Sequence, residues 1–177
     1  KDTKPALVIL ELNTPGGEVF AAQRISNALR TLDTKYGIPV IAYINNWAIS
    51  AGAMLAYSCR YIVAAPDACM GAATPVFQTE KGMEAAPEKV NSALRADFAN
   101  RAAFFDRNPD IAQAMVDPDL ILIRRNDKIL GLSTESELLP TDVIISPKGK
   151  LVTLTADQLR NLSVADWMIP KNVSEAP

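Results

Sequence analysis

The stretch "NNWAISAGAMLAYSC", from Asn45 to Cys59, marks the place where an apolar strand gives way to a helix. Ser50 stands at this junction, in a run of very small residues. A serine in this setting is a tight-turn residue, the N-cap of the following helix or an attacking nucleophile. Because the chain contains no histidine, a Ser-His-Asp triad is excluded, and a nucleophilic serine needs another base.

Strand and helix patterns alternate at short intervals around this junction. Apolar runs predict buried strands at 6–12, 39–44 and 61–65, and helices at 18–34 and 50–58. Such alternation is typical of right-handed βαβ units built on a parallel sheet. The sequence therefore predicts an α/β fold.

The second half of the chain follows a different pattern. A long helix is predicted over 87–105, with proline in its opening turn, and Asn108 is expected to cap a short helix after it. Strands are predicted at 120–125 and, as a hairpin around Pro147-Lys148-Gly149, within 142–155. We therefore expect a small β-rich C-terminal part.

The whole chain, 1–177, is predicted to be a single domain. The segment 106–154 is rich in turn signals and is predicted to be an insertion or oligomerisation arm, which pairs subunits or covers a cleft. A further helix follows this segment, because Thr155 and Gln158 have the spacing of a capping box.

Composition limits the function classes. With 49% hydrophobic and 21% charged residues, the chain is typical of a globular protein with a sizeable core. Its net charge of −2 argues against a nucleic-acid partner, since phosphate binding needs clustered cations. Cys59 and Cys69 lack a metal-ligand spacing and are expected to be small buried thiols. Neither a metal nor a cofactor is predicted.

Membrane insertion is not expected of this segment itself, because no apolar run approaches the ~18 residues that cross a bilayer. The chain starts without methionine and runs at once into strand-like sequence. We therefore expect a part of a longer protein, with any signal peptide or anchor outside it.

The turn "NTPGG", Asn13 to Gly17, is the second candidate feature, because it also joins a strand to a helix. Pro15 restricts the turn, and Gly16 and Gly17 leave backbone N–H groups bare for close approach to a ligand. Such groups near a helix N-terminus suit an oxyanion. An ordinary βα turn explains the same residues equally well, so the motif alone leaves both interpretations open.

Three motifs together resemble a known family. The segments "LELNTPGGEV", "AISAGAMLAYSCRYIVAAP" and "MGAATPV", in this order, resemble the Clp-protease/crotonase superfamily. They are most similar to its membrane-bound serine protease branch, the NfeD family, which is related to signal peptide peptidase A. The match covers about 6–105, and "LVTLTADQL" resembles a later segment of such domains. The resemblance implies a ββα superhelix of stacked parallel strands and helices.

The resemblance also implies roles for particular residues. The attacking serine of the family falls on Ser50, and the glycine pair that lends oxyanion N–H groups falls on Gly16 and Gly17. The other oxyanion donor is the N–H of the residue after the serine, Ala51. In this branch a lysine replaces the histidine of Clp proteases, which agrees with the absence of histidine here.

The family places this lysine at the start of the long helix, which corresponds to Lys89. A cation in the first turn of a helix opposes the macrodipole by about 0.3–1 kcal/mol, so the position is a poor one for a merely solvated lysine. A lysine acts as a base only when neutral, which requires a pKa near ~7–8 instead of ~10.4. Lys81 is the competitor, and a solvated helix-end charge beside Glu88 is the alternative for Lys89.

The function implied by the resemblance is a serine endopeptidase with a Ser-Lys dyad. Its relatives cut apolar segments of membrane-associated proteins such as stomatin-like proteins, and they imply a homodimer or larger homo-oligomer. The domain is expected to be a soluble, extracytoplasmic part of a membrane-anchored parent. Two alternatives stay open: a non-catalytic scaffold with a protease fold, and a crotonase-like acyl-CoA enzyme that uses a carboxylate as acid and base.

Overall fold

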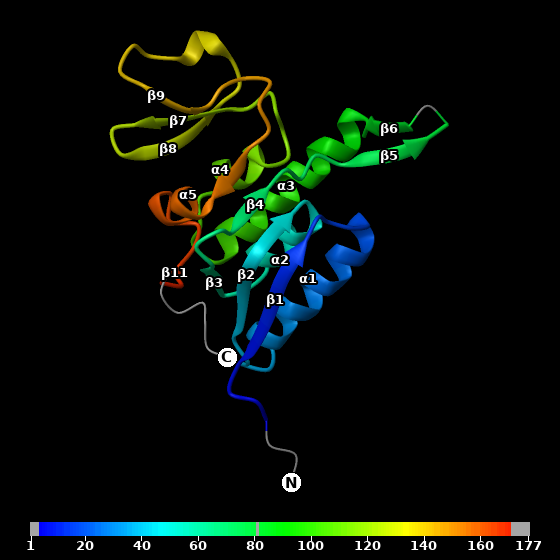
Figure 1. Cartoon of the computed structure of the whole chain (residues 1–177). Coiled ribbons are helices and arrows are strands. Elements are labelled where there is room, and N and C mark those ends of the chain that lie inside the picture. The colour runs from blue at the N-terminus through cyan, green and yellow to red at the C-terminus, as the bar shows by residue number, and fades with distance from the viewer. Residues whose placement is uncertain (1–3, 81, 171–177) are drawn as a thin grey trace. The chain divides into compact units, whose positions relative to one another are not determined.

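The computed structural model describes residues 4–80 and 82–170. Within these ranges the chain forms two compact units (Figure 1). The first unit contains the residues up to Met70 and those from Leu154 onward, and the second unit runs from Gly71 to Thr153. Nearly all of the segment 106–154, the predicted insertion or arm, therefore belongs to the second unit.

The first unit is built on a mostly parallel sheet, as the sequence predicts. Three parallel strands form its centre: β1 (Val8–Thr14), β2 (Val40–Ile49) and β3 (Tyr61–Ala64). The other strands of the six-stranded sheet are β4 (Cys69–Gly71), β10 (Thr153–Thr155) and β11 (Trp167–Met168), in the order β10-β4-β2-β3-β11 with β1 beside β2. The predicted α/β class is confirmed.

Two helices pack on this sheet. The first is α1 (Val19–Thr34), and the second is α2 (Ala51–Tyr57); both contact β2. The carboxylate of Glu18 begins α1 by accepting hydrogen bonds from the Phe20 and Ala21 N–H groups, at 2.9 and 2.7 Å. This cap satisfies two of the N–H groups that a helix start leaves unpaired. The carboxyl end of β1 leads through a short turn into α1, and that of β2 leads through Ser50 into α2.

Parallel pairing brings those two strand ends together. Leu12 pairs with Ile44, whereas Thr14 pairs with Ala48, so β2 contains an irregularity of two extra residues between these pairs. Bulges of this kind re-aim the chain and are frequent beside functional sites. Because both strands point the same way, the turn after β1 and Ser50 after β2 lie at the same edge of the sheet.

The second unit contains two helices and two small antiparallel sheets. The helices are α3 (Glu88–Phe104) and α4 (Pro109–Ala114), which confirms the predicted long helix and the short helix after it. As predicted, the Asn108 side chain caps α4, accepting hydrogen bonds from the N–H groups of Asp110 and Ile111 at 2.8 and 3.2 Å. The single-turn 3-10 helix is Glu135–Glu137.

A three-stranded sheet of order β8-β7-β9 forms the β-rich part of this unit. Its strands are β7 (Ile121–Arg125), β8 (Lys128–Leu132) and β9 (Val143–Ser146). The Arg125 guanidinium donates two hydrogen bonds of 2.7 Å to Asp142, which lowers the pKa of that carboxyl to about 2. This ion pair links the end of β7 to the residue directly before β9.

The predicted hairpin around Pro147-Lys148-Gly149 is wrong. β9 pairs with β7, whereas β10 joins β4 in the other sheet. Hydrogen bonds to residues distant in sequence fix the turn and the segment after it. The Gly149 N–H donates to Pro118 O at 2.7 Å, and the Val152 N–H donates to Ala114 O at 3.2 Å. Two strand-like patterns next to each other in sequence therefore do not pair with each other here.

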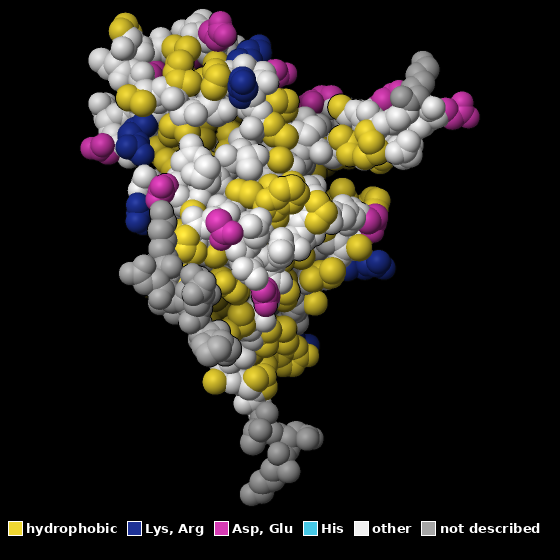
Figure 2. All heavy atoms as spheres, viewed as in Figure 1, with side chains coloured by type: hydrophobic (Ala, Val, Ile, Leu, Met, Phe, Trp, Pro, Cys, Tyr) yellow, Lys and Arg dark blue, Asp and Glu magenta, His cyan; other side chains and the backbone are white. Residues whose placement is uncertain are grey.

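The two-stranded hairpin of the second unit consists of β5 (Val76–Thr79) and β6 (Gly82–Ala85). Its apolar side chains are unusually exposed: Val76 by 49%, Phe77 by 48% and Met83 by 63%. Figure 2 shows hydrophobic side chains gathered on this hairpin, with acidic ones beside them. An isolated two-stranded hairpin is marginally stable in water, and this one presents apolar side chains to the solvent.

Both cysteines are free: Cys59 is buried, as predicted, and Cys69 is only half-buried. Burial, and secondly the charge of Asp67, raise the pKa of the Cys69 thiol. The last helix, α5 (Ala156–Asn161), has the predicted capping box of Thr155 and Gln158. Over the described ranges, no helix has the length and apolar character of a membrane span, and no His, Cys, Asp or Glu side chains cluster as a metal site.

Candidate active site

Ser50 occupies a strained turn between β2 and α2. Its backbone angles are φ 55° and ψ −116°, a conformation that residues other than glycine rarely adopt. Although Ser50 stands at the N-cap position of α2, its side chain makes no capping hydrogen bond. Strain of this kind gathers at active sites and is the geometry of serine nucleophiles at strand-to-helix turns. The capping alternative therefore does not explain why a serine stands here.

The glycine turn lies directly against this serine. Gly16 has φ +123°, and a Cβ atom on it would lie 2.7 Å from Ser50 Cβ and 3.1 Å from Ser50 Oγ. No side chain fits between the two residues, because real Cβ contacts are not that short. Gly17 is exposed, and a Cβ atom on it would have no neighbour within 4 Å. Two motifs more than 30 residues apart in sequence thus meet at one point.

The three predicted oxyanion donors differ in their hydrogen bonds. The Gly16 N–H donates to Thr14 Oγ1 at 3.1 Å. Among the residues that the structure describes, no acceptor is bound to the N–H of Gly17 or to that of Ala51, the first residue of α2. Two unpaired N–H groups beside a serine hydroxyl are the donors that a tetrahedral oxyanion needs.

Lys89 belongs to the second unit, where it is the second residue of α3 and is exposed. Pro87 stands at the N-cap of this helix and offers no side-chain cap. Glu88 is engaged with Arg95, whose guanidinium lies 3.3 Å from its carboxylate. Lys81 lies outside the described residues. The position in the first helical turn, which is unfavourable for a cation, is as the sequence predicts.

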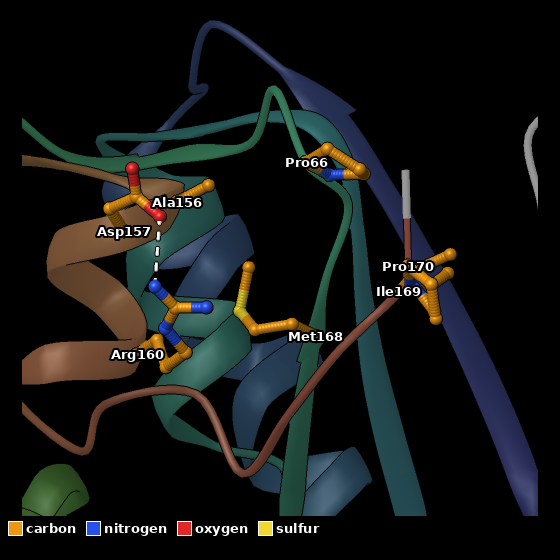
Figure 3. A pocket seen from close by; sticks show the side chains of 7 residues that line it. All are labelled: Pro66, Ala156, Asp157, Arg160, Met168, Ile169 and Pro170. Atoms are coloured by element: carbon orange, nitrogen blue, oxygen red, sulfur yellow. Dashed lines mark hydrogen bonds and ion pairs between the residues drawn. The ribbon is translucent and has the colours of Figure 1, made fainter. Parts of the chain in front are cut away.

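A pocket in the first unit lies apart from these residues. It has a volume of about 400 Å³. Figure 3 shows the side chains around it, with the guanidinium of Arg160 paired to Asp157 at 3.2 Å on one side. The pocket is lined by Pro66, Ala156, Asp157, Arg160, Met168, Ile169 and Pro170. None of the predicted catalytic or oxyanion residues borders it, so this pocket is not part of the candidate active site at Ser50.

One consequence of the Ser50 geometry is measurable without a substrate. The Ser50→Gly variant is expected to unfold at a higher temperature than the wild type. Relief of the backbone strain stabilises the folded state by ~1–3 kcal/mol. The greater conformational freedom of glycine in the unfolded chain offsets ~0.5–1 kcal/mol of this gain. A net gain of about 1 kcal/mol corresponds to a rise in Tm of roughly 2–4 °C, measured by differential scanning calorimetry.

Ser58→Gly is the matched control for that measurement. Ser58 has an ordinary φ of −88°, and its buried hydroxyl donates to Met54 O at 2.7 Å, so glycine there lowers Tm. A Tm for Ser50→Gly at or below that of the wild type contradicts the strained turn.

A family model and a curated relative match the sequence of this chain. The family model of the NfeD1b N-terminal domain matches residues 1–140. Membrane protein NfeD1b of Bacillus subtilis (strain 168) is 35% identical over 158 residues, which are 89% of this chain and 30% of the relative. The chain thus spans about a third of the length of this relative, which is a membrane protein.

Three of the similar solved structures are forms of one membrane-bound stomatin-specific protease, 1510-N. A serine-to-alanine mutant has a TM-score of 0.66 at 22% identity, covering 93% of this chain and 64% of its own. A lysine-to-alanine mutant in complex with a substrate peptide has a TM-score of 0.67 at 22% identity, covering 93% and 61%. The protease specific for a stomatin homolog from Pyrococcus horikoshii reaches 0.53 at 20% identity, covering 93% and 58%.

At these identities the structural likeness concerns the fold, and the family assignment rests on the sequence match over 1–140. The fold is mixed α/β, with a mostly parallel sheet and small antiparallel sheets, as in the 1510-N structures. With its NTPGG turn set against Ser50, the chain belongs to the family of NfeD1b N-terminal domains.

Proposed function

We propose that this domain is a serine endopeptidase in which Ser50 attacks the peptide carbonyl. The observation that carries the proposal is the strained turn of Ser50, whose hydroxyl caps no helix and stands against the glycine turn. Glycine would adopt φ 55° and ψ −116° without strain, and the Ser50 side chain makes no capping hydrogen bond that would favour a serine there. A half-buried nucleophile beside unpaired N–H groups explains why a serine stands here.

In this mechanism Ser50 Oγ forms a bond to the carbonyl carbon as its proton moves to a neutral amine. The negative charge that develops on the carbonyl oxygen is held by the N–H groups of Gly17 and Ala51. The tetrahedral intermediate then expels the amine half of the peptide, which takes the proton, and an ester to Ser50 remains. Water, deprotonated by the same amine, hydrolyses this ester and restores the serine.

We assign the amine to Lys89. Its place at the start of α3 follows the family resemblance. The neighbouring Glu88 carboxylate pairs with Arg95, so it does not hold the lysine as an ion-pair partner. The solved relatives include a lysine-to-alanine mutant with a bound substrate peptide, which supports a lysine in the reaction rather than in peptide binding.

The substrate class follows from the relatives and from one surface of this chain. The stomatin-specific proteases imply an apolar peptide from a membrane-associated, stomatin-like partner. The exposed apolar side chains of the β5–β6 hairpin stand a few residues before Lys89 in the chain and suit such a peptide. The resemblance further implies a homo-oligomer and an extracytoplasmic position for this part of a membrane-anchored parent.

Covalent labelling tests the proposal. A fluorophosphonate probe is expected to modify the wild-type protein at Ser50, as located by peptide mass spectrometry, and to leave Ser50→Ala unmodified. Ser92→Ala, which removes an exposed hydroxyl from α3, is the control and is expected to label as the wild type does. The wild type and the control are also expected to cleave a quenched-fluorescent peptide with an apolar core.

Labelling that persists in Ser50→Ala refutes the nucleophile. If neither labelling nor cleavage occurs with a panel of apolar peptides, the fold serves as a non-catalytic scaffold instead.

A further inference from the structure

Thr14, the last residue of β1, makes two interactions that were not predicted from the NTPGG motif. Its Oγ1 accepts a hydrogen bond from the Gly16 N–H at 3.1 Å and donates one to Gly16 O at 3.2 Å. A hydroxyl supplies one donor and two acceptor sites, so both bonds can form at once. They clamp both polar groups of the glycine and fix the path of the chain through the turn.

The methyl group of Thr14 makes the second interaction. A Cβ atom on Gly52 would lie 2.7 Å from Thr14 Cγ2 and 3.7 Å from Ala48 Cβ. Gly52 is buried in the first turn of α2, two residues after Ser50. Only the absence of a side chain on Gly52 therefore lets the methyl group pack against the helix that carries the nucleophile.

These contacts join three segments of the first unit. The hydroxyl side of Thr14 holds the glycine turn, while its methyl side touches the start of α2. The glycine turn also contacts Ser50, because there is no space for a Cβ atom between Gly16 and Ser50. One half-buried side chain thus sets the spacing between the turn and the nucleophile.

The hydroxyl also decides which N–H group is available to a ligand. Because the Gly16 N–H is bonded to Thr14, it is not the donor to an oxyanion. The next N–H along the chain, that of Gly17, is the one left unpaired among the described residues. The sequence offers Gly16 and Gly17 as oxyanion donors, and in the structure only the N–H of Gly17 is available.

We propose that Thr14 is the positioning residue of the oxyanion site: its hydroxyl aims the Gly17 N–H at the substrate and its methyl group sets the distance to α2. The inference rests on the proposed peptidase function for its kinetic consequence only. Its structural content, the clamped Gly16 and the contact with Gly52, can be tested without any reaction.

A matched pair of variants separates the two halves of the side chain. Thr14→Val keeps both branches but replaces the hydroxyl with a methyl group, whereas Thr14→Ser keeps the hydroxyl and removes the methyl group. We expect Thr14→Val to lower kcat for the apolar peptide about 10–100-fold with little change in KM, because the donor is needed in the transition state. Thr14→Ser is expected to recover most of that loss. Thr31→Val, which deletes a hydroxyl bonded to Asn27 O on α1, is the control.

Amide hydrogen exchange provides the readout that does not depend on activity. The Gly16 amide is expected to be protected in the wild type and in Thr14→Ser, and to exchange much faster in Thr14→Val, while the Gly17 amide exchanges fast in all three. A Gly16 amide with equal protection in Thr14→Val overturns the proposal, whether or not the protein cleaves peptides. So does a wild-type kcat in Thr14→Val.

A double-mutant cycle tests the methyl contact. Gly52→Ala is expected to lower Tm, and combining it with Thr14→Ser is expected to restore part of the loss, because serine has no atom at the Cγ2 position. Strictly additive changes in Tm overturn this half of the proposal. If the wild type itself proves inactive, the peptidase function fails, yet the exchange and stability measurements still decide the role of Thr14.

Discussion

The Lys89→Ala variant is expected to hydrolyse an apolar test peptide about 10²–10⁴-fold more slowly than the wild type, the usual effect of removing a general base. Without the amine, the proton of Ser50 Oγ has no acceptor as the bond to the carbonyl carbon forms. The remaining contacts to the peptide are unchanged, so the loss falls on kcat while KM changes little. Steady-state kinetics with a quenched-fluorescent peptide separates the two constants.

A change of rate alone does not distinguish a base from a structural lysine, but chemical rescue of Lys89→Ala by a small amine does. Added methylamine is expected to restore part of the rate in proportion to its unprotonated fraction.

Lys128→Ala is the matched control for these measurements. Lys128 is an exposed lysine on β8 of the same unit, and its removal is expected to leave the kinetics as they are. A wild-type kcat in Lys89→Ala, together with its loss in Lys81→Ala, moves the role of base to Lys81.

The parts of the fold that were predictable from sequence are those fixed by neighbours along the chain. Continuous apolar runs located β1, β2 and β3, and helical spacing or composition located α1 and α2, because such patterns are local properties of the chain. The caps at Asn108 and Thr155 were likewise predictable, since each side chain bonds to backbone two or three residues away. Such signals need no knowledge of the rest of the protein.

Pairing between distant segments was not predictable in the same way. β9 and β10 read as two arms of a hairpin, yet each bonds to a strand far away in sequence. β8 was missed because its pattern is short and interrupted by Gly131. That glycine has a tertiary cause, since a Cβ atom on it would lie 2.9 Å from Leu120 Cδ2. Strand pairs and contacts between distant residues depend on tertiary packing, which cannot be read from a single sequence.

The candidate site divides along the same line. The sequence and its family resemblance identified Ser50 as the candidate nucleophile and the glycine pair as candidate oxyanion donors. They did not distinguish Gly16 from Gly17 as donors. The hydrogen bond to Thr14 makes them different, and it depends on the rotamer of one hydroxyl. A threonine directly before the "PGG" turn was the available signal, because such hydroxyls bond to backbone two residues on.

Gly16→Ala is expected to damage both the fold of the first unit and its activity. The added methyl group would lie 2.7 Å from Ser50 Cβ, and φ +123° is a conformation that alanine strongly disfavours. Backbone strain and overpacking together destabilise the protein by about 2–5 kcal/mol, or roughly 5–15 °C in Tm. Because Ser50 must move to relieve the contact, kcat is expected to fall at least ~100-fold in the molecules that remain folded.

Gly17→Ala is the matched control for the stability effect, since its Cβ atom would meet nothing within 4 Å and its φ lies outside the left-handed range. Its Tm is expected to stay within about 1–2 °C of the wild type, as for an ordinary surface substitution. Differential scanning calorimetry of the two variants, with fluorophosphonate labelling at a temperature where both are folded, measures fold and site separately. Equal melting temperatures for the two variants contradict the close contact of Gly16 with Ser50, because that contact is the physical difference between two adjacent glycines.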